Sequence, residues 1–490
     1  MDRSNQGDFR RTNGADFLQL NAAEAPAGGL AGWLTDQLRT AIADGRLPIG
    51  SRLPASRLLA AELQVSRGVV TEAYQRLTED GHVSGRGRAG TVVVAAPALA
   101  PAPRERAFEL PPKIYAPGLD IFDALRAAPA RIDLTPGVPD LASFPRAAWL
   151  RSERAVLTNL EASAFGYGDP SGTPELRGAV SNWLARYRGI TAHPDEVIIV
   201  AGVSQAIGLL AQLLSTRGIT EVAVEDPGSL GSRQHMEEWQ LRARPIPVDE
   251  NGLQVDVLRK SDAEVVMVTP AHHFPTGVVL GGERRRDLLQ WAADGGLIFE
   301  DDYDAEHRYD RPPVPALRSM QADQVIYAGS VSKLLAPALR IGWIVPPAKY
   351  REDFIALKRR ADLGNASLPQ LTLAHLMDSG ELERQLRYVH RRHRTRRDTM
   401  ATAIAKYLPT ATVHGAAAGL HLTITFPPGL DDTALATAAL AEGVKTHPLS
   451  WHCQLPHAPG LVLGYAARTP TELTDAIRVI ADIVAATGRG

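Results

Sequence analysis

The stretch that decides the fold is Val325-Ile-Tyr-Ala-Gly-Ser-Val-Ser-Lys333-Leu-Leu-Ala-Pro-Ala-Leu-Arg340-Ile-Gly-Trp343. A short apolar strand runs into a glycine, two serines and a lysine, and an arginine follows seven residues after the lysine. A lysine amine can form an imine with an aldehyde, while Ser330, Ser332 and the Arg340 guanidinium can bind a phosphate. Taken alone, the stretch also fits a helix start with a surface arginine, so its meaning depends on the rest of the chain.

The same part of the chain alternates continuous apolar runs with amphipathic helical stretches. The apolar runs are 197–200, 222–224, 265–268, 297–299, 325–327 and 341–345, and two of the helical stretches are 205–214 and 284–293. Continuous apolar runs are typical of strands covered on both faces. The pattern predicts an α/β fold with a mostly parallel, doubly wound sheet, whose ligands bind at the carboxyl ends of the strands. A long basic helix after about 380, strands at 420–426 and 461–465 and a helix at 471–485 predict a smaller C-terminal α+β lobe.

Bulk properties limit the class of protein. A length of 490 residues indicates more than one domain, and 44% apolar with 22% charged residues is ordinary for a soluble protein. The net charge of −2 gives no overall attraction to nucleic acid or to anionic membranes. Cys453 is the single cysteine, so an intrachain disulfide and a multi-cysteine zinc site are excluded, and we expect no metal site. With no signal peptide and no run that could span a bilayer, we expect a cytoplasmic protein without membrane contact.

A Pro/Ala tract at 95–104 divides the chain, because such a tract builds no core and serves as a semi-rigid linker. We therefore expect a flexible N-terminal segment at 1–29 and a small module at 30–95. The linker then covers 96–129, and the large domain covers 130–490.

The small module has the pattern of a winged helix-turn-helix. A helix is expected at 33–43, a second at 57–63 with Ser56 as its N-cap, and a third from Ser66 to about 79. The second and third helices are closely joined, as in a helix-turn-helix, and the third can then enter a DNA major groove. Strands at 82–84 and 91–94 flank a glycine-rich tip with two arginines, which suits phosphates or a minor groove. The alternative is a small helical module that binds protein.

Three segments of this module resemble the GntR family of winged-helix regulators. They are Gly45-Arg-Leu-Pro-Ile-Gly-Ser-Arg-Leu-Pro-Ala-Ser-Arg57, Val65-Ser-Arg67 and Ala73-Tyr-Gln-Arg-Leu-Thr-Glu-Asp-Gly81. The resemblance implies a double-stranded DNA operator as partner. The residues implied to face DNA are Arg57, Ser66 and Arg67, with Arg86 and Arg88 in the wing.

Three further features accompany Lys333. Asp301 ends the apolar run 297–299 and could keep a pyridine nitrogen protonated; a solvated acidic loop or a divalent-metal site is the alternative. Ser204 and Gln205 begin a helix directly after a strand, where free backbone N–H groups bind phosphate. His273 follows another strand and offers an imidazole to a phenolate oxygen, although such histidines are more often structural.

In this order the features resemble fold-type I pyridoxal 5′-phosphate (PLP) enzymes, the aspartate aminotransferase class, over roughly 130–490. The resemblance implies that Lys333 forms the internal aldimine, Asp301 binds the pyridine nitrogen and Tyr303 binds the ring hydroxyl. It places Ser204, Gln205, Ser330, Ser332 and Arg340 around the phosphate. Tyr167 looks like the tyrosine that reaches across a dimer interface to the other subunit's cofactor.

A GntR-type winged helix joined to such a domain resembles the MocR/GabR family of regulators, and within it the PdxR type of vitamin B6 regulator. The run Glu300-Asp-Asp-Tyr-Asp-Ala-Glu-His-Arg-Tyr309 is close to that family's own sequence. The family plan implies a homodimer, head-to-tail and domain-swapped, that presents two winged helices and responds to a small-molecule effector.

Three positions depart from the aminotransferase pattern. Ser229 stands where an aromatic residue stacks on the cofactor, and His273 replaces the usual amide. Val462 stands where the enzymes carry an arginine for the substrate α-carboxylate, and Arg233 or Arg468 could substitute for it.

We therefore expect a PLP-dependent transcriptional regulator of vitamin B6 metabolism that senses PLP itself or, as second choice, an amine without an α-carboxylate. We assign no catalytic residue. The alternatives are an active aminotransferase with an appended DNA-binding domain and a degenerate fold that no longer binds the cofactor.

Overall fold

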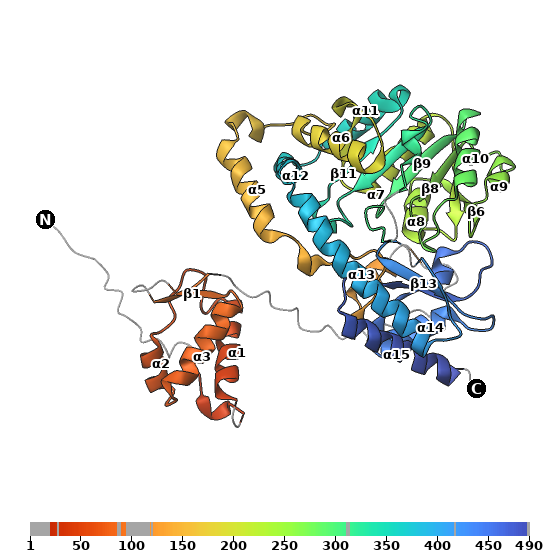
Figure 1. Cartoon of the computed structure of the whole chain (residues 1–490). Coiled ribbons are helices and arrows are strands. Elements are labelled where there is room, and N and C mark those ends of the chain that lie inside the picture. The colour runs from red at the N-terminus through yellow and green to blue at the C-terminus, as the bar shows by residue number, and fades with distance from the viewer. Residues whose placement is uncertain are drawn as a thin grey trace. The chain divides into compact units, whose positions relative to one another are not determined.

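The computed structural model describes residues 20–26, 29–85, 90–94, 118, 121–309, 314–415 and 418–487 (Figure 1). The chain divides into a smaller unit, residues 1–107, and a larger unit, residues 108–490. Arg86 and Arg88, expected in the wing, lie outside the described residues, as does most of the expected linker. Of the segment 1–29 the structure describes 20–26 and 29, where Leu20 packs against the core of the smaller unit.

In its described residues the smaller unit has a short 3-10 helix at Ala22–Glu24, three α-helices and a hairpin. The α-helices and strands are α1 Leu30–Ala43, α2 Ser56–Glu62, α3 Arg67–Glu79, β1 Val83–Gly85 and β2 Thr91–Val93, with β1 and β2 antiparallel. The Ser66 hydroxyl accepts the Val69 N–H and caps α3, as predicted. The prediction of Ser56 as a cap was wrong, because α2 begins at Ser56 and its cap position is Ala55. The Tyr74 hydroxyl donates to the Pro54 carbonyl at 2.7 Å and ties α3 to the segment that precedes α2.

The larger unit is built on an eight-stranded sheet in the order β4-β11-β10-β9-β8-β5-β6-β7. In that order the strands are Ile198–Val200, Gly342–Val345, Val325–Ser330, Leu297–Asp302, Val265–Val268, Glu221–Asp226, Arg242–Asp249 and Gly252–Leu253. β10, β9, β8, β5 and β6 are parallel, whereas β11 and β7 run antiparallel to their neighbours. All six predicted strands are present. β6 was missed, because Pro245 and Pro247 interrupt its pattern and it lies near the edge of the sheet.

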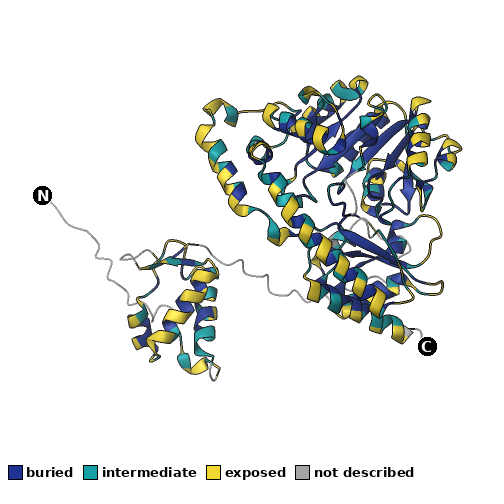
Figure 2. Ribbon diagram, in the orientation of Figure 1, coloured by how far each residue is buried: buried dark blue, intermediate teal, exposed yellow. Residues whose placement is uncertain are grey.

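Helices cover both faces of this sheet, which confirms the doubly wound prediction (Figure 1). On one face lie α7 Val203–Thr216, α8 Leu230–Glu238 and α11 Arg351–Asp362. On the other face lie α6 Pro174–Arg188, α9 Val255–Arg259, α10 Gly282–Ala293 and α12 Ser367–Asp378. α5 Arg146–Asn159 packs against α12. Figure 2 shows the strands buried and the outer surfaces of the helices exposed.

The C-terminal lobe has a four-stranded sheet in the order β12-β13-β16-β15. Its elements are α13 Glu381–Tyr407, β12 Thr412–His414, β13 His421–Thr425, α14 Asp432–Ala441, β14 Val444–Lys445, β15 His447–Pro448, β16 Gly460–Gly464 and α15 Pro470–Thr487. β14 pairs with β3 Ile132–Asp133, so the start of the larger unit belongs to this lobe. Among the described residues no helix is both long and apolar enough to cross a membrane.

The expected linker extends too far towards the C-terminus. Its last part contains α4 Ile121–Ala127, whose Ile121 and Leu125 form a buried cluster with Leu230 and Trp451. Composition suggested a linker here, but the i, i+4 spacing of these two apolar residues is helical.

A buried ion pair ties α6 to the sheet. Arg188 Nε donates to Asp302 Oδ2 at 2.5 Å, and the Tyr327 hydroxyl donates to the same oxygen at 2.6 Å. The side chains of Arg188 and Asp302 are 0% and 2% exposed. Removing one partner leaves an uncompensated buried charge, which typically costs about 3–5 kcal/mol.

We therefore expect Arg188→Met to lower the free energy of unfolding of the larger unit by about 3 kcal/mol or more. Urea unfolding followed by tryptophan fluorescence measures the change. The control is Arg217→Met, which breaks the exposed pair with Asp353 and should cost less than about 1 kcal/mol. Equal unfolding midpoints for the two variants would contradict this account.

Candidate functional site

A cavity of about 500 Å³ opens at the carboxyl ends of the parallel strands of the larger unit. It brings together most of the predicted cofactor residues, namely Ser204, Asp301, Tyr303, Ser330, Ser332, Lys333 and Arg340. These side chains come from α7, the end of β9, the end of β10 and the loop that leads to β11, so the topology assembles what the sequence separates.

One end of the cavity is suited to a phosphate. α7 begins after Gly202, which has φ +81° and no side-chain cap, so the N–H groups of the first turn face the cavity without a side-chain acceptor. The Arg340 guanidinium donates to the Ala201 carbonyl oxygen. A Cβ on Gly202 would lie 3.3 Å from Arg340 Nη1, so a glycine here lets the arginine approach. Ser330 and Ser332 complete this end.

Lys333 and Asp301 form the centre of the site. Burial lowers the pKa of Lys333, and the carboxylates of Asp304 and Asp301 oppose that shift. Burial, with Asp302 and Asp304 nearby, raises the pKa of Asp301 to about 7. Asp301 Oδ1 is buried and has no hydrogen-bond partner among the described residues. A protonated ring nitrogen would supply the missing donor and the missing positive charge.

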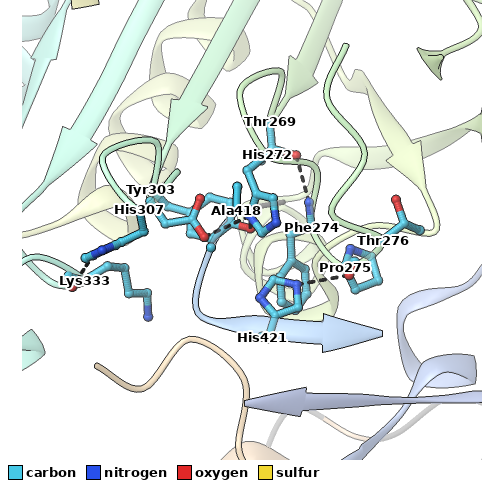
Figure 3. Close-up of polar contacts among 12 residues, drawn as sticks. Thr269, His272, Phe274, Pro275, Thr276, Tyr303, His307, Lys333, Ala418 and His421 are labelled. Carbon is cyan, nitrogen blue, oxygen red and sulfur yellow. Dashed lines mark hydrogen bonds and ion pairs between the residues drawn. The ribbon is translucent and has the colours of Figure 1, made fainter. Parts of the chain in front are cut away.

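Tyr303 lines the cavity, and its hydroxyl lies 3.1 Å from His272 Nδ1 (Figure 3). Burial raises the pKa of Tyr303 well above its ordinary value, and the carboxylates of Asp304 and Asp301 add to the shift. The hydroxyl therefore keeps its proton at neutral pH. It can donate a hydrogen bond to a phenolate oxygen in the cavity.

Three predicted residues are not in the cavity wall. His273 lies behind it: its Nδ1 is 2.6 Å from the Thr276 hydroxyl and its Nε2 is 3.7 Å from Glu225. His273 therefore does not line the cavity as expected, and its neighbour His272 lies beside Tyr303. Gln205 is also turned away, since its amide contacts the Ala201 N–H and Asp362. Tyr167 is 96% exposed and lies outside the cavity of its own chain.

The sequence prediction missed several residues that line the cavity. Phe122 and Arg126 lie on α4, and Gly137 has φ +75°, with its missing Cβ directed at Lys333 Nζ, 3.0 Å away. His447 and His452 enter from the C-terminal lobe, and burial lowers the pKa of His447 to about 4. The Thr-Pro-Gly turn after β3 was a usable signal, whereas nothing local distinguished the two histidines.

The structure places the other two departures, Ser229 and Val462, and the two suggested substitute arginines. The Ser229 hydroxyl caps α8 by accepting the Ser232 N–H. Val462 is fully buried in β16. Of the two suggested substitutes, Arg233 lines the cavity, and its guanidinium donates to the carbonyls of Gly228, Trp451 and His452. Arg468 donates to the carbonyl of Asp133 at 2.9 Å.

The donor set fits PLP. The start of α7 and Arg340 can bind the phosphate, and Lys333 can react with the aldehyde. The Asp301 carboxylate, whose Oδ1 has no hydrogen-bond partner among the described residues, can bind the ring nitrogen. The acidic run around Asp301 is not arranged for a metal, since no group of three His, Cys, Asp or Glu side chains among the described residues could hold one.

We expect Asp301→Asn to weaken PLP binding about 10- to 100-fold, because a hydrogen bond to a charged group contributes about 1.5–3 kcal/mol. Absorbance titration of the cofactor-free protein measures the affinity. Unchanged affinity would contradict the role of Asp301.

In the absence of cofactor, the Asp301→Asn variant should be at least as stable as the wild type. The pKa of Asp301 is raised from 3.8 in the unfolded chain to about 7 in the folded protein. Its carboxyl therefore contributes fully to the stability of the folded protein below pH 3.8, and this contribution is lost as the pH rises through about 7. Asparagine has no such loss. The melting temperature of the variant minus that of the wild type should therefore increase from pH 5 to pH 8.

Comparison with known proteins gives two family matches. Residues 131–480 match the family described as aminotransferase class I and II, and residues 31–93 match bacterial regulatory proteins of the gntR family.

Several regulators are similar to this chain along most of its length. The probable rhizopine catabolism regulatory protein MocR of Rhizobium meliloti is 30% identical, over 91% of each chain. The pyridoxine biosynthesis transcriptional regulator PdxR of Corynebacterium glutamicum is 28% identical, over 92% of this chain and 95% of PdxR. The regulator TauR of Rhodobacter capsulatus is 31% identical, over 86% and 89%.

Solved aminotransferases share the fold of the larger unit. A kynurenine aminotransferase from Pyrococcus horikoshii superposes with a TM-score of 0.68 at 24% identity, over 75% of this chain and 94% of that one. LysN, the α-aminoadipate aminotransferase of Thermus thermophilus, also gives 0.68, at 23% identity over 74% and 94%. With a GntR domain ahead of an aminotransferase class I and II domain, and regulators similar to it along almost its whole length, the chain belongs to the MocR type of transcriptional regulators.

Proposed function

We propose that this regulator uses its aminotransferase-like unit as a sensor of PLP, and that it controls genes of vitamin B6 metabolism. The chain is a DNA-binding transcriptional regulator, and its larger unit binds PLP. When bound, the cofactor supplies an aldehyde that condenses with a lysine amine. The protein residues hold it: Lys333 at the aldehyde, Asp301 at the ring nitrogen, Tyr303 at the ring hydroxyl, and Ser204, Ser330, Ser332 and Arg340 at the phosphate.

The observation that carries this proposal is that Val462, where the enzymes are expected to carry an arginine, is a buried apolar residue of β16. A planar guanidinium fixes a carboxylate through two parallel hydrogen bonds, which an isopropyl group cannot do. Arg233 and Arg468 are engaged with backbone carbonyls. The PdxR relative, which is named for pyridoxine biosynthesis, supports the same direction. Arg126 also lines the cavity, so the test below includes amino acids.

The smaller unit supplies the DNA contact. Arg57, Ser66 and Arg67 are exposed, and they lie at the start of α2 and of α3, the two helices of the helix-turn-helix. We propose that these three side chains contact the operator, where arginine is well suited to guanine edges and phosphates.

A second copy of the chain is the proposed partner of the exposed apolar side chains on α5 and on the segment that follows it. Leu150 is 63% exposed, Phe165 60% and Tyr167 96%. Exposed large apolar side chains along one segment of the chain are suited to an interface. A head-to-tail, domain-swapped dimer would bring Tyr167 to the cofactor of the other subunit. We place this dimer in the cytoplasm.

Cofactor sensing predicts that PLP changes the affinity of the protein for DNA by about 5-fold or more. The sites that the protein occupies in cells, mapped with and without added pyridoxine, would supply the DNA, and binding is then measured at fixed salt. Lys333→Ala should abolish the response, whereas Lys260→Ala, an exposed lysine at the end of α9, should keep it.

Two outcomes would overturn the proposal. The first is DNA binding that ignores PLP but responds to one amino acid. The second is repeated turnover of an amino acid to its keto acid, which would indicate an active aminotransferase with an appended DNA-binding domain.

The dimer predicts that Leu150→Glu shifts the protein from dimer to monomer, because a buried unpaired carboxylate is costly. Sedimentation velocity over a range of concentrations measures the shift. Met320→Glu is the matched control, since Met320 is 59% exposed on the loop before β10. Equal behaviour of the two variants would argue against an interface on α5.

A further inference from the structure

A carboxylate and an imidazole lie directly behind Tyr303, outside the set of residues that line the cavity. His272 Nδ1 is 2.9 Å from Asp304 Oδ2 and 3.1 Å from the Tyr303 hydroxyl. The side chains of His272 and Asp304 are each 1% exposed. Figure 3 shows His272 next to Tyr303, with Lys333 nearby. A buried carboxylate is costly unless it is paired, so this arrangement calls for an explanation.

The position of His272 is fixed by two glycines from different parts of the chain. Gly419, with φ +80°, comes from the C-terminal lobe, and a Cβ on it would lie 2.0 Å from His272 Cε1. Gly277, with φ +71°, would place a Cβ 3.0 Å from Nε2. The ring therefore fills a space that only glycines leave open, and its Nδ1 is held towards Tyr303 and Asp304.

The hydrogen-bonding pattern assigns the proton. Two oxygen atoms lie within hydrogen-bond distance of Nδ1, and one of them is a carboxylate oxygen, so Nδ1 carries the hydrogen and donates to Asp304. The hydrogen of the Tyr303 hydroxyl then does not point at Nδ1. It remains available to an acceptor in the cavity or to Asp304.

Asp304 also acts on Lys333. Of the nearby charges that favour the protonated form of Lys333, Asp304 acts most strongly and Asp301 next. His307 braces the same loop: its N–H donates to the Asp304 carbonyl at 2.9 Å, and its Nε2 donates to the Lys333 carbonyl at 3.2 Å.

We propose that Asp304 and His272 are positioning residues that together set the proton affinity of the lysine–cofactor bond: His272 orients the Tyr303 hydroxyl towards the ring oxygen, which lowers that affinity, and the Asp304 carboxylate near Lys333 raises it. The proposal rests on PLP binding at Lys333 and extends it to residues that do not touch the cofactor. Other titratable groups face this region from the packed elements, namely Glu225 on β5, Asp301 on β9, His307 on the loop after β9 and His421 on β13.

The test is a pH titration of the absorption band of the lysine-bound cofactor in the full-length protein. Asp304→Asn keeps the shape and removes the charge, and the titration midpoint should fall by about one pH unit or more. His272→Ala should raise it, because a Tyr303 hydroxyl that no longer donates to the ring oxygen no longer stabilises the unprotonated form. His272→Asn should restore it to within about 0.3 units of the wild type, since its amide nitrogen can occupy the position of Nδ1 and donate to Asp304.

A double variant shows whether His272 acts through the tyrosine. In a Tyr303→Phe background, His272→Ala should shift the midpoint much less than it does in the wild type. An unchanged midpoint in Asp304→Asn would overturn the proposal, as would a full His272→Ala shift without the tyrosine hydroxyl. If Asp304→Asn loses the cofactor, the two His272 variants decide the outcome.

The outcomes that would refute these positioning roles differ from those that would refute the proposed function. A wild-type protein that forms no lysine-bound cofactor band would refute both the sensor and the positioning roles. A wild type that forms the band but whose DNA binding ignores PLP would refute only the sensor. A wild type that senses PLP, with variants that titrate as it does, would refute only the roles of Asp304 and His272.

Discussion

The ion pair between Arg188 and Asp302 is the contact on which the geometry of the site depends. Successive residues of a strand point to opposite faces, so Asp302 faces the α6 layer while Asp301 faces the cavity. Asp302 also accepts the hydroxyl of Tyr327 on β10, the strand that leads to Ser330 and Lys333. One buried carboxylate thus holds in register the two strands that deliver the ring-nitrogen partner and the lysine.

The sheet was predictable because its strands are buried on both faces and are therefore apolar throughout. The cavity followed from the rule that parallel strands end at one edge, and Lys333, Asp301 and Arg340 meet there. Two adjacent histidines could not be told apart in this way. Which of them faces Tyr303 depends on the turn at Gly277 and on Gly419, about 150 residues away in the chain. α4 was hidden because a proline-rich composition precedes it and its own pattern spans only two turns.

The site combines features that serve binding with features that limit chemistry. The residues at the phosphate end of the cavity and Lys333 are those expected of the aminotransferase fold. Val462 is buried in β16, and the cavity wall contains the imidazoles of His447 and His452, whose pKa values burial lowers. As the proposed sensor, such a cavity would hold the cofactor without orienting an amino acid for turnover. Retention without turnover is the behaviour that a sensor requires.

The pairing of β3 with β14 has a mechanical consequence. Residues 121–137 are the first substantial part of the larger unit that the structure describes, and they reach Phe122 and Gly137 at the cavity wall before the chain enters the main fold. Within the described residues, the N-terminal part of the larger unit therefore runs along the cavity. A molecule that fills the cavity would contact the residues with which this unit begins.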